Sequence, residues 1–243
     1  MTERQAVRYI GTYLWRIERY GMIFTLLFAA YLGIVLGTAV DELVKPDEEH
    51  PAIGHILVEW IYLSMFPIFG LVMNKFSWGL WKDDAYSRRL AHWRSMPIPV
   101  SSIVKARMLQ SLVTAPIGAI IFMGIQYAIG PSLRDAVTPL EWIGNGAVWT
   151  CYAFAILAFI VWLELGFSGK IYCIYYFALM FLLAAISVTL NLLGIHLFME
   201  TLELVRQGYA WVLIAGMAAV AVASLAAFGR LTENRVRGRS LAL

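Results

Sequence analysis

The 243-residue sequence is poor in charged residues, which make up 14% of it, against about 25% in an average soluble domain. A soluble protein of this size needs more polar side chains to cover its surface. Cysteine is scarce as well, and Cys151 and Cys173 both lie within apolar runs, so a disulfide framework and zinc sites of the CxxC kind are excluded. Apolar residues reach 60% instead. These proportions predict a membrane protein.

The motifs of the usual membrane enzymes are also missing. The sequence contains no HExxH, no GxSxG and no pair of aspartates within an apolar run. Residues 166–171, GFSGKI, have a superficial likeness to a phosphate-binding loop, but the first glycine of that motif is absent and Ile171 replaces the Ser or Thr. We therefore expect a chain that is not an enzyme, binds no metal or other cofactor and does not itself hydrolyse nucleotide.

Six apolar runs bounded by charged residues occupy much of the chain. About 20 helical residues are needed to cross the hydrocarbon core of a bilayer, and none of the runs shows the alternation of a membrane barrel. The predicted spans are residues 20–40, 53–74, 107–130, 142–167, 171–194 and 208–229. The expected fold class is an all-α membrane protein, with six transmembrane helices in a single transmembrane domain covering residues 1–243.

The basic residues are unequally distributed between the two sides of this topology. Of the 19 lysines and arginines, only Lys45, Arg134 and Arg206 fall on the side opposite the two termini. Cytoplasmic segments of membrane proteins are enriched in Lys and Arg, so both termini are predicted to lie in the cytoplasm. Because the charges are sorted by side and the net charge is only +3, we expect no nucleic-acid partner.

Residues 3–19 precede the first apolar run and have a helical repeat of their own. Val7, Ile10, Leu14 and Ile17 fall on one face of a helix, and arginines occupy much of the rest. This pattern predicts an N-terminal interfacial amphipathic helix on the inner membrane surface. Two roles are compatible with this pattern. The helix could be an anchor that fixes the topology, or it could have a mechanical role in the function of the protein.

Two polar residues in the second predicted span lie four positions apart, on one helix face. They are His55 and Glu59. A charge in lipid is costly, so Glu59 is expected to face protein or a water-filled path, or to be protonated. Three interpretations stay open for the pair: polar groups satisfied at the extracellular end, part of a translocation path, or a metal or proton relay.

Other polar residues lie near the ends of the predicted spans. Glu164 is near the cytoplasmic end of its span and is expected to pair with Lys170. Asn191 and His196 are at the outer end of the fifth span, where they would either line a pathway or form hydrogen bonds between helices.

The loop of residues 75–106 is the largest polar connection, and its pattern predicts a short helix over 83–96. Asp83 or Asp84 can cap the start of this helix. Pro97 disfavours helical geometry in the residue before it, so the helix stops near Ser95. After the stiff proline step, Ser101 or Ser102 can cap the third span. The predicted helix has an apolar aromatic face and a basic remainder, comprising Tyr86, Leu90 and Trp93 on the first and Arg88, Arg89 and Arg94 on the second.

The stretch DDAYSRRLAHWRSMPIPVSSIVKAR, residues 83–107, resembles the loop before the third span in ABC-2 type ABC transporter permeases, the membrane subunits of bacterial ABC exporters. The resemblance extends to a surface helix before the first span, six spans and both termini inside. The Pro97-Ile98-Pro99 step is its most informative part. The last extracellular connection, about 195–207, is shorter than in family members that move polysaccharide or drugs, so the substrate class stays open.

The resemblance implies a coupling helix at 83–96 that docks in a groove of a separate ABC ATPase subunit, where ATP and Mg would bind. It also implies two permeases, a second copy or a paralogue, around a pathway lined largely by the first, second and fifth spans. The location would be the bacterial plasma membrane, with the chain passing several times through the lipid bilayer. The residues implicated in coupling are Asp84, Tyr86, Arg88, Arg89, Leu90, Trp93, Arg94, Met96, Pro97 and Pro99. The candidate path residues are His55, Glu59, Asn191 and His196.

The expected function is that of a permease subunit of an ATP-driven ABC transporter. Few charges lie along the spans, which favours export of a hydrophobic or amphipathic substrate such as a peptide, a drug or a lipid. The alternative is a secondary transporter or a membrane-embedded enzyme without a nucleotide-binding partner. A secondary transporter should show repeats and broken helices in matching positions, and an enzyme should show polar groups converging at one depth. Export and an immunity or regulatory role both fit the sequence.

Overall fold

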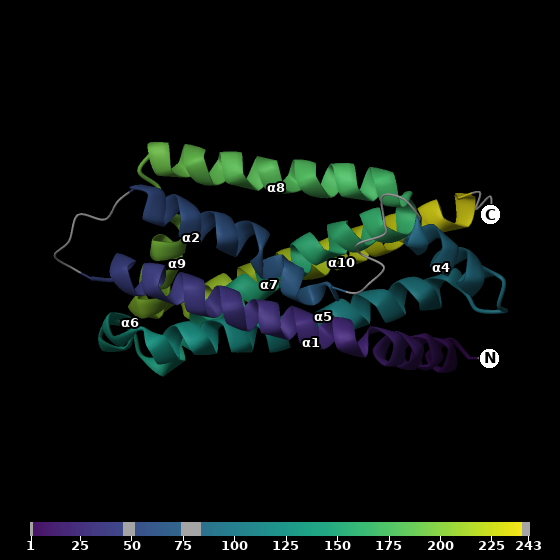
Figure 1. The fold of residues 1–243 in the computed structure, drawn as a ribbon, viewed down its shortest axis with the longest axis horizontal. Coiled ribbons are helices and arrows are strands. Elements are labelled where there is room, and N and C mark those ends of the chain that lie inside the picture. The colour runs from purple at the N-terminus through teal and green to yellow at the C-terminus, as the bar shows by residue number, and fades with distance from the viewer. Residues whose placement is uncertain (1, 46–51, 74–83, 240–243) are drawn as a thin grey trace.

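The computed structural model describes residues 2–45, 52–73 and 84–239. All the regular structure in these ranges is helical, and the helices form an elongated bundle (Figure 1). Both termini lie at one end of the bundle, together with the short helix α4 (Figure 1). The elements, in chain order, are α1 (Glu3–Leu43), α2 (Ala52–Ser64), η1 (Phe66–Gly70), α4 (Ala85–Arg94), α5 (Val100–Ile129), α6 (Pro131–Ala136), α7 (Pro139–Gly166), α8 (Gly169–Leu192), α9 (Leu197–Leu204), η2 (Val205–Tyr209) and α10 (Ala210–Gly238).

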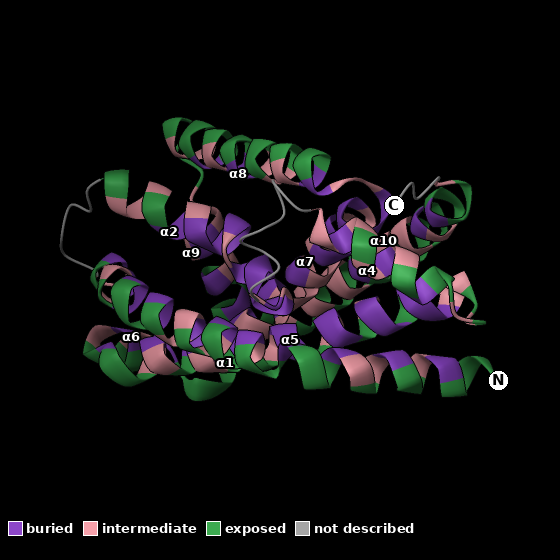
Figure 2. Ribbon diagram, turned by 45° about the vertical axis from the view of Figure 1, so that its right-hand side comes forward, coloured by how far each residue is buried: buried purple, intermediate pink, exposed green. Residues whose placement is uncertain are grey.

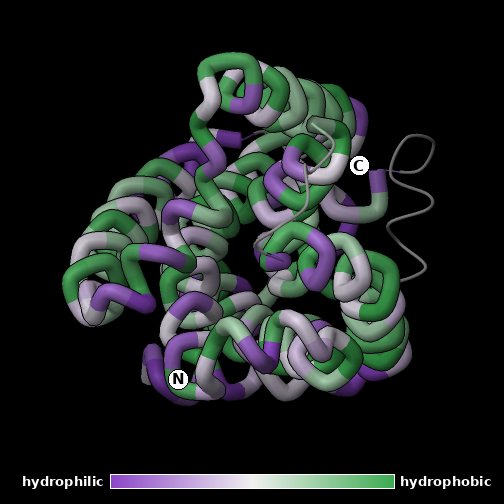
Figure 3. The backbone as a smooth tube through the Cα atoms, turned by 90° about the vertical axis from the view of Figure 1, so that its left-hand side faces the viewer, coloured by the Kyte–Doolittle hydropathy of each residue, from purple (hydrophilic) through white to green (hydrophobic). Residues whose placement is uncertain are grey.

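Six helical segments in the described part of the chain are long and apolar enough to cross a membrane. They correspond to the six apolar runs, so the prediction of an all-helical protein with six candidate spans is confirmed. α1, α5, α7 and α8 supply four of them, α2 with η1 supplies the second, and the segment from α9 to α10 supplies the last. Hydrophobic residues occur along all the long helices, as the colours of the backbone show (Figure 3), and many of them are exposed on the outside of the bundle.

The first span is not preceded by a separate surface helix. α1 is one continuous helix of 41 residues, about 62 Å long, whereas the bilayer with its headgroups is about 40–45 Å thick. Its buried stripe continues without a shift from Ala6, Ile10 and Leu14 into the apolar half. No proline interrupts the chain between the two parts, so the helix runs on. The prediction of an interfacial helix over 3–19 is therefore wrong, because this segment packs on the protein along the axis of the span.

The second span is broken, which the sequence analysis did not predict for residues 53–74. α2 ends at Ser64, the 3-10 turn η1 follows with Pro67 near its start, and the chain from Leu71 is extended. Proline has no N–H to continue an α-helix, which explains the position of the break. Residue 74 lies outside the described residues.

Backbone groups freed by this break are satisfied by threonines of two other spans. The Thr25 hydroxyl, from α1, donates to the Leu71 carbonyl at 3.2 Å and accepts from the Met73 N–H at 3.0 Å. The Thr114 hydroxyl, from α5, donates to the Gly70 carbonyl at 3.1 Å. Unpaired backbone groups inside a membrane are costly, so these contacts allow the non-helical segment to exist within the bundle.

The centre of the bundle is an aromatic cluster around Tyr62 of α2. The Tyr62 ring lies 4.5 Å from that of Phe198 and 5.0 Å from that of Trp149, measured between centroids. Its hydroxyl donates to Gln126 Oε1 at 2.7 Å. Phe198 belongs to α9, so the connection before the last span is more than a simple loop. It contains a short helix whose Phe198 is fully buried against α2 and α7.

The helices differ in how much of their surface other helices cover. α1 packs along α5, and α7 packs along α10. Gly33 permits the first contact, because a Cβ at this position would lie only 2.8 Å from the Phe122 carbonyl oxygen of α5. α8 packs mainly on α2 and leaves most of its surface exposed (Figure 2). At the far end, Gly208 adopts a φ of 88°, which lets the chain turn from α9 into α10.

Candidate functional site

The helix predicted between the second and third spans exists as α4, Ala85–Arg94. Asp84 caps its first turn by accepting a hydrogen bond from the Ser87 N–H, and Ser95 follows its last residue. The predicted stop near Ser95 is confirmed, since Pro97 and Pro99 separate α4 from α5. Residue 83, at the predicted start, lies outside the described residues. The third span begins directly at Val100, so the predicted serine cap is wrong, and Pro99 takes the capping position.

The aromatic face of α4 packs inside the chain. Tyr86, Leu90 and Trp93 are 7%, 1% and 1% exposed. Leu90 and Trp93 share one core with α1 and the first turns of α5, and the Tyr13 ring lies edge-on to Trp93 at 6.3 Å. We expected these three side chains to fill a pocket on an ATPase. The structure shows instead that they attach α4 to its own bundle.

Arg89 connects α4 to two spans by buried ion pairs. Its guanidinium lies 2.5 Å from Glu18 Oε1 of α1 and 2.9 Å from Glu164 Oε1 of α7. The same group lies over the Tyr86 and Trp93 rings, at 5.2 and 5.0 Å from their centroids. A guanidinium suits this position because its planar fork can donate to two carboxylates at once.

A second arginine completes this network from α5. The guanidinium of Arg107 donates to Glu164 through Nε, at 3.1 and 3.0 Å from the two carboxylate oxygens, and through Nη2 to Oε2 at 2.8 Å. Arg107 Nη1 donates to Gln110 Oε1 at 2.9 Å, and Gln110 Nε2 donates to Glu18 Oε2 at 2.7 Å. We call these five residues, Glu18, Arg89, Arg107, Gln110 and Glu164, the charge network. Its two arginines and two glutamates balance in charge.

The partner expected for Glu164 was wrong. The sequence analysis paired it with Lys170, its neighbour along the chain, but Lys170 is exposed at the start of α8. Glu164 is 1% exposed and is held by arginines from α4 and α5. A buried carboxylate needs close, well-directed partners, and these arginines supply several hydrogen bonds to the same group.

Two further contacts tie the ends of α4 to the rest of the bundle. Asp84 Oδ1 accepts from the Gly169 N–H at 2.8 Å, so one carboxylate caps both α4 and α8. At the end of α10, Arg239 donates to the Ser87 hydroxyl and to the Leu165 carbonyl, while Arg94 donates to the Arg239 carbonyl at 2.6 Å. Burial lowers the pKa of the Arg239 guanidinium, and nearby Asp84 opposes this shift.

The opposite face of α4 is exposed at the end of the bundle. Arg88, His92 and Arg94 project from it, and Ser95 continues the surface. Pro97 and Pro99 are also exposed, whereas Met96, just before them, is half-buried against the core under α4. Of the coupling residues proposed from the resemblance, this face therefore offers only Arg88, Arg94 and the prolines to a partner.

A hollow of about 380 Å³ lies behind α4, between the broken second span and α8. It is mainly apolar and aromatic, and Arg107 of the charge network reaches its wall. The described residues that line it are Ile68, Leu71, Val72, Met73, Tyr86, Arg107, Tyr172, Cys173, Tyr176 and Phe177. Three parts of the chain thus border the hollow: the extended end of the second span, the fifth span α8 and the helix α4.

Comparison with protein-family models, curated proteins and solved structures finds no match for this chain.

Three of the four candidate path residues meet at the far end of the bundle. The rings of His55 and His196 stack at 3.9 Å between centroids, and His196 directly precedes α9. Glu59, one turn further along α2, is 1% exposed and faces the backbone of Leu197 at the start of α9. Neither of its oxygens has a hydrogen bond of normal geometry within the described ranges. Asn191 lies in the last turn of α8, and no described contact joins it to this group.

The side chains of this group are not arranged as the ligands of a metal site. Among the described residues, no cluster of three or more His, Cys, Asp or Glu side chains is placed to hold a metal ion. Metal sites of transition ions need at least three such ligands around one point. The metal interpretation of His55 and Glu59 therefore has no support from the geometry, and a polar cluster at the end of the bundle remains.

The charge network was missed because its members were considered one segment at a time. Glu18 was counted with the supposed surface helix, Arg107 with the start of the third span, and Glu164 with its sequence neighbour. A usable signal was present: acidic and basic residues from separate apolar helices fall at the same predicted depth, near the side of the termini. Charges at equal depth in neighbouring helices are expected to pair, because lipid cannot solvate them.

Proposed function

We propose that this chain is the membrane-spanning subunit of an ATP-driven transporter of the ABC-2 type, in a bacterial plasma membrane with both termini in the cytoplasm. α4 is its coupling helix, and ATP binds with Mg to a separate ATPase subunit. Two permease chains, either two copies or this chain with a paralogue, form the pathway.

The observation that carries this proposal is the way α4 is attached. One face is exposed at the end of the bundle, and the other is bonded to α1, α5, α7, α8 and the end of α10. Arg89, for example, contacts carboxylates of α1 and α7 at once. A displacement of α4 is therefore shared by most of the spans. A partner that binds one position of α4 more tightly when ATP is bound would shift the bundle between two conformations.

The hollow behind α4 supports a hydrophobic or amphipathic substrate. Its aromatic and aliphatic walls favour apolar matter, and the Arg107 guanidinium at the wall is already neutralised by Glu164. A free sugar or an ion would leave its polar groups without partners on such walls. The hollow lies next to the helix that receives the force, so movement of α4 changes its shape directly.

The first experiment tests docking. We expect a tagged version of the chain, purified from its native membrane in mild detergent, to retain a partner that hydrolyses ATP. Replacing both Arg88 and His92 with Glu should remove that activity from the purified material, because it reverses the charge of the exposed face. Arg230→Glu, an equally exposed change on α10, is the matched control and should retain it. A parent protein that brings no ATP hydrolysis with it contradicts the proposal.

The second experiment tests coupling without a known substrate. Cys173 lines the hollow, so in a Cys151→Ala background its rate of labelling by a maleimide reports the shape of the hollow. We expect a non-hydrolysable ATP analogue to change this rate severalfold in the complex with the ATPase. Arg89→Lys, which cannot contact both carboxylates as a fork, should keep the ATPase bound but abolish the change. The control is Cys151 in a Cys173→Ala background, whose labelling rate should not respond. An unchanged response in Arg89→Lys contradicts the role of α4.

The broken second span favours one other candidate, a secondary transporter. Transporters of that class use discontinuous helices around their binding sites. They carry such breaks in matching positions of two repeats. Among the described residues the second span breaks at η1 and the last candidate segment turns at Gly208, near one end, so the two interruptions are not in matching positions. Substrate uptake that follows an ion gradient, in vesicles with the purified chain alone, would establish this candidate in place of the first.

A further inference from the structure

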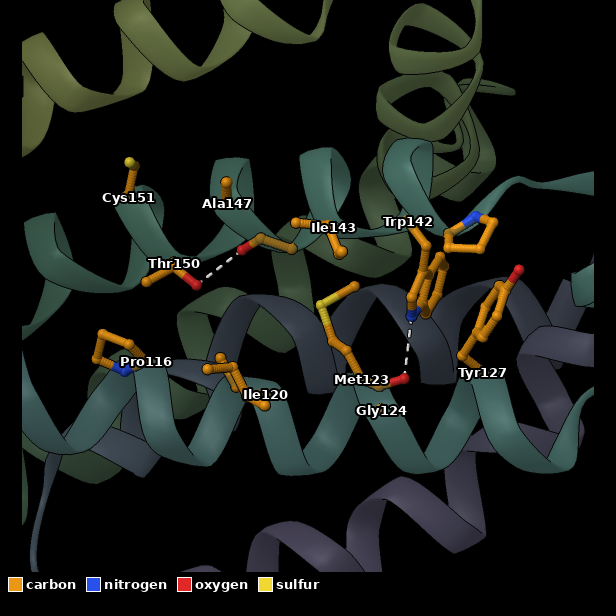
Figure 4. A pocket seen from close by; sticks show the side chains of 13 residues that line it. Pro116, Ile120, Met123, Gly124, Tyr127, Trp142, Ile143, Ala147, Thr150 and Cys151 are labelled. Atoms are coloured by element: carbon orange, nitrogen blue, oxygen red, sulfur yellow. Dashed lines mark hydrogen bonds between the residues drawn. The ribbon is translucent and has the colours of Figure 1, made fainter.

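The seam between α5 and α7 contains an apolar groove away from α4 and its hollow. The groove has a volume of about 520 Å³ (Figure 4). Pro116, Ile120 and Tyr127 line it from α5, while Ile143 and Cys151 line it from α7 (Figure 4). Small residues create the space: Gly124 of α5 and Gly146 and Ala147 of α7 lie along its course.

The groove is open to the surroundings of the bundle, and its length fits one leaflet. Ile120 and Ile143, on its two banks, are 72% and 67% exposed. From Pro116 to Tyr127 the helix rises about 16 Å, close to half of the roughly 30 Å hydrocarbon core. This stretch is the second half of α5, so the groove belongs to the leaflet at the end of the bundle opposite the termini.

Two aromatic residues with polar groups, Trp142 and Tyr127, line the end of the groove farthest from the termini. Trp142 Nε1 donates to the Met123 carbonyl at 2.9 Å, and the Tyr127 hydroxyl donates to the Val137 carbonyl at 3.2 Å, so both rings are held in place. Arg134 is not part of the groove lining; it lies on the short helix α6 that joins α5 to α7 and donates to the carbonyl of Ala128, one residue beyond Tyr127, at 3.2 Å. In the described part of the chain no carboxylate forms an ion pair with this exposed arginine.

We propose that this groove is a phospholipid site, with one acyl chain lying between α5 and α7 and the phosphate bound by Arg134. The aliphatic walls match the chain, and the guanidinium matches the phosphate at the depth where a headgroup begins. Surrounding lipid already solvates apolar surfaces, so the acyl chain alone gives little preference for this place. Selection therefore depends on Arg134. The inference is independent of the proposed transport function.

The test compares phospholipid retained by the purified chain after detergent exchange, measured by native mass spectrometry. The parent protein should retain one phospholipid per chain. Arg134→Gln should lower the retained fraction at least about tenfold, because it removes a charge-assisted contact to phosphate. Arg206→Gln is the matched control: Arg206 lies at the same end but is paired with Glu203 at 3.0 Å, and its loss should leave retention unchanged. Ala147→Phe, which fills the groove, should reduce retention as Arg134→Gln does.

Three results would overturn the proposal. The first is a parent chain that retains no phospholipid, and the second is an Arg134→Gln variant that retains as much as the parent. The third concerns a different occupant, a second copy of this chain. In a Cys173→Ala variant the thiol of Cys151 in the groove is the only one left, so its efficient disulfide cross-linking between two chains in membranes would show that protein covers this seam.

Discussion

The buried arginine and glutamate pairs of the charge network mainly determine the relative positions of the helices. They contribute less to the stability of the bundle. Removing two charges from water costs about as much as their attraction returns, whereas removing one partner leaves the other unpaired. Arg107 is 3% exposed and Glu164 1%. Arg107 donates several hydrogen bonds to Glu164, and both side chains are shielded from solvent by the surrounding helices. The network therefore mainly disfavours other arrangements of α1, α4, α5 and α7, because those arrangements would leave buried charges without partners.

Loss of one carboxylate of the network is the first prediction. Glu164→Gln should lower the free energy of unfolding by about 3–5 kcal/mol, because it leaves Arg107 buried with an incomplete set of acceptors. Arg89 would lose the same partner. Denaturation of the purified protein, followed by circular dichroism in detergent, measures the change. Glu203→Gln removes the exposed pair with Arg206 and should cost no more than about 1 kcal/mol. Equal effects of the two substitutions would contradict the structural role of the network.

At the same scale, the sequence predicted which side chains share a helix face better than it predicted what those side chains contact. The period of Tyr86, Leu90 and Trp93 correctly placed the three on one face of α4, because helical spacing alone decides that. Whether the face meets a partner or the chain's own bundle depends on helices that are distant in sequence. The same limit applied to Glu164, whose true partners are 57 and 75 positions away. Trp93→Ala is consequently a change to the core of the bundle and no test of docking.

At the scale of elements, the close contact between α1 and α5 depends on Gly33. The glycine spacing in the sequence already indicated such a contact. Gly33 and Gly37 are four residues apart in an apolar helix, the spacing that allows two membrane helices to approach closely. In the structure both face α5. This signal was available in the sequence, unlike the break in the second span, where Pro67 alone does not reveal whether a helix kinks or ends.

Gly33→Ala should separate these two helices. The added Cβ would lie 2.8 Å from the Phe122 carbonyl oxygen, a backbone atom that cannot move by itself, so we expect a loss of at least about 1–3 kcal/mol, the usual cost of overpacking. Gly11→Ala is a matched control in the same helix, because a Cβ at Gly11 meets nothing within 4 Å. That variant should be neutral or up to about 1 kcal/mol more stable through helix propensity. Thermal denaturation of both proteins compares them, and an equal response would contradict the close approach.

The extended end of the second span leads to a prediction about threonine. Thr25→Val keeps the shape of the side chain but removes the acceptor of the Met73 N–H and the donor to Leu71. We expect a loss of about 1–3 kcal/mol for the unsatisfied backbone group, and recovery in Thr25→Ser. Faster hydrogen exchange of residues 71–73, measured by mass spectrometry, should accompany it. In the control Thr189→Val only a bond within α8 is lost, so exchange at 71–73 should stay unchanged.

At the scale of the whole molecule, the distribution of basic residues is the physical basis of the orientation that we propose. In the described ranges the end with α4 and the termini carries most of the arginines, and the far end carries only Lys45, Arg134 and Arg206 among the lysines and arginines. The number of candidate spans follows from the lengths of the apolar runs, and the proposed orientation follows from the positions of the lysines and arginines. Both are properties of the sequence alone, which is why the general architecture was predictable. The continuous α1, the helix α9 and the peripheral position of α8 come from tertiary contacts and were not.

Orientation is directly measurable with single thiols in a Cys151→Ala, Cys173→Ala background. A cysteine at Glu203, at the far end, should react with a membrane-impermeant thiol reagent on intact cells. A cysteine at His92, on the exposed face of α4, should react only after the cells are broken. The opposite pattern would reverse the topology and with it the proposed side of ATPase docking. Labelling at both positions on intact cells would contradict a fixed orientation.

The charge network also constrains how the protein is made. Glu18 is synthesised first, whereas Arg89 and Arg107 follow much later and Glu164 comes 146 residues after it. At about 5–20 residues per second, α1 waits roughly 7–30 s before the last member emerges. Glu18 itself pairs with Arg89 and Gln110, which follow it by 71 and 92 residues, whereas Arg107 lacks its carboxylate partner until Glu164 is made. The charge network is therefore complete only once α7 has been made, while α8, α9 and α10 are still to follow.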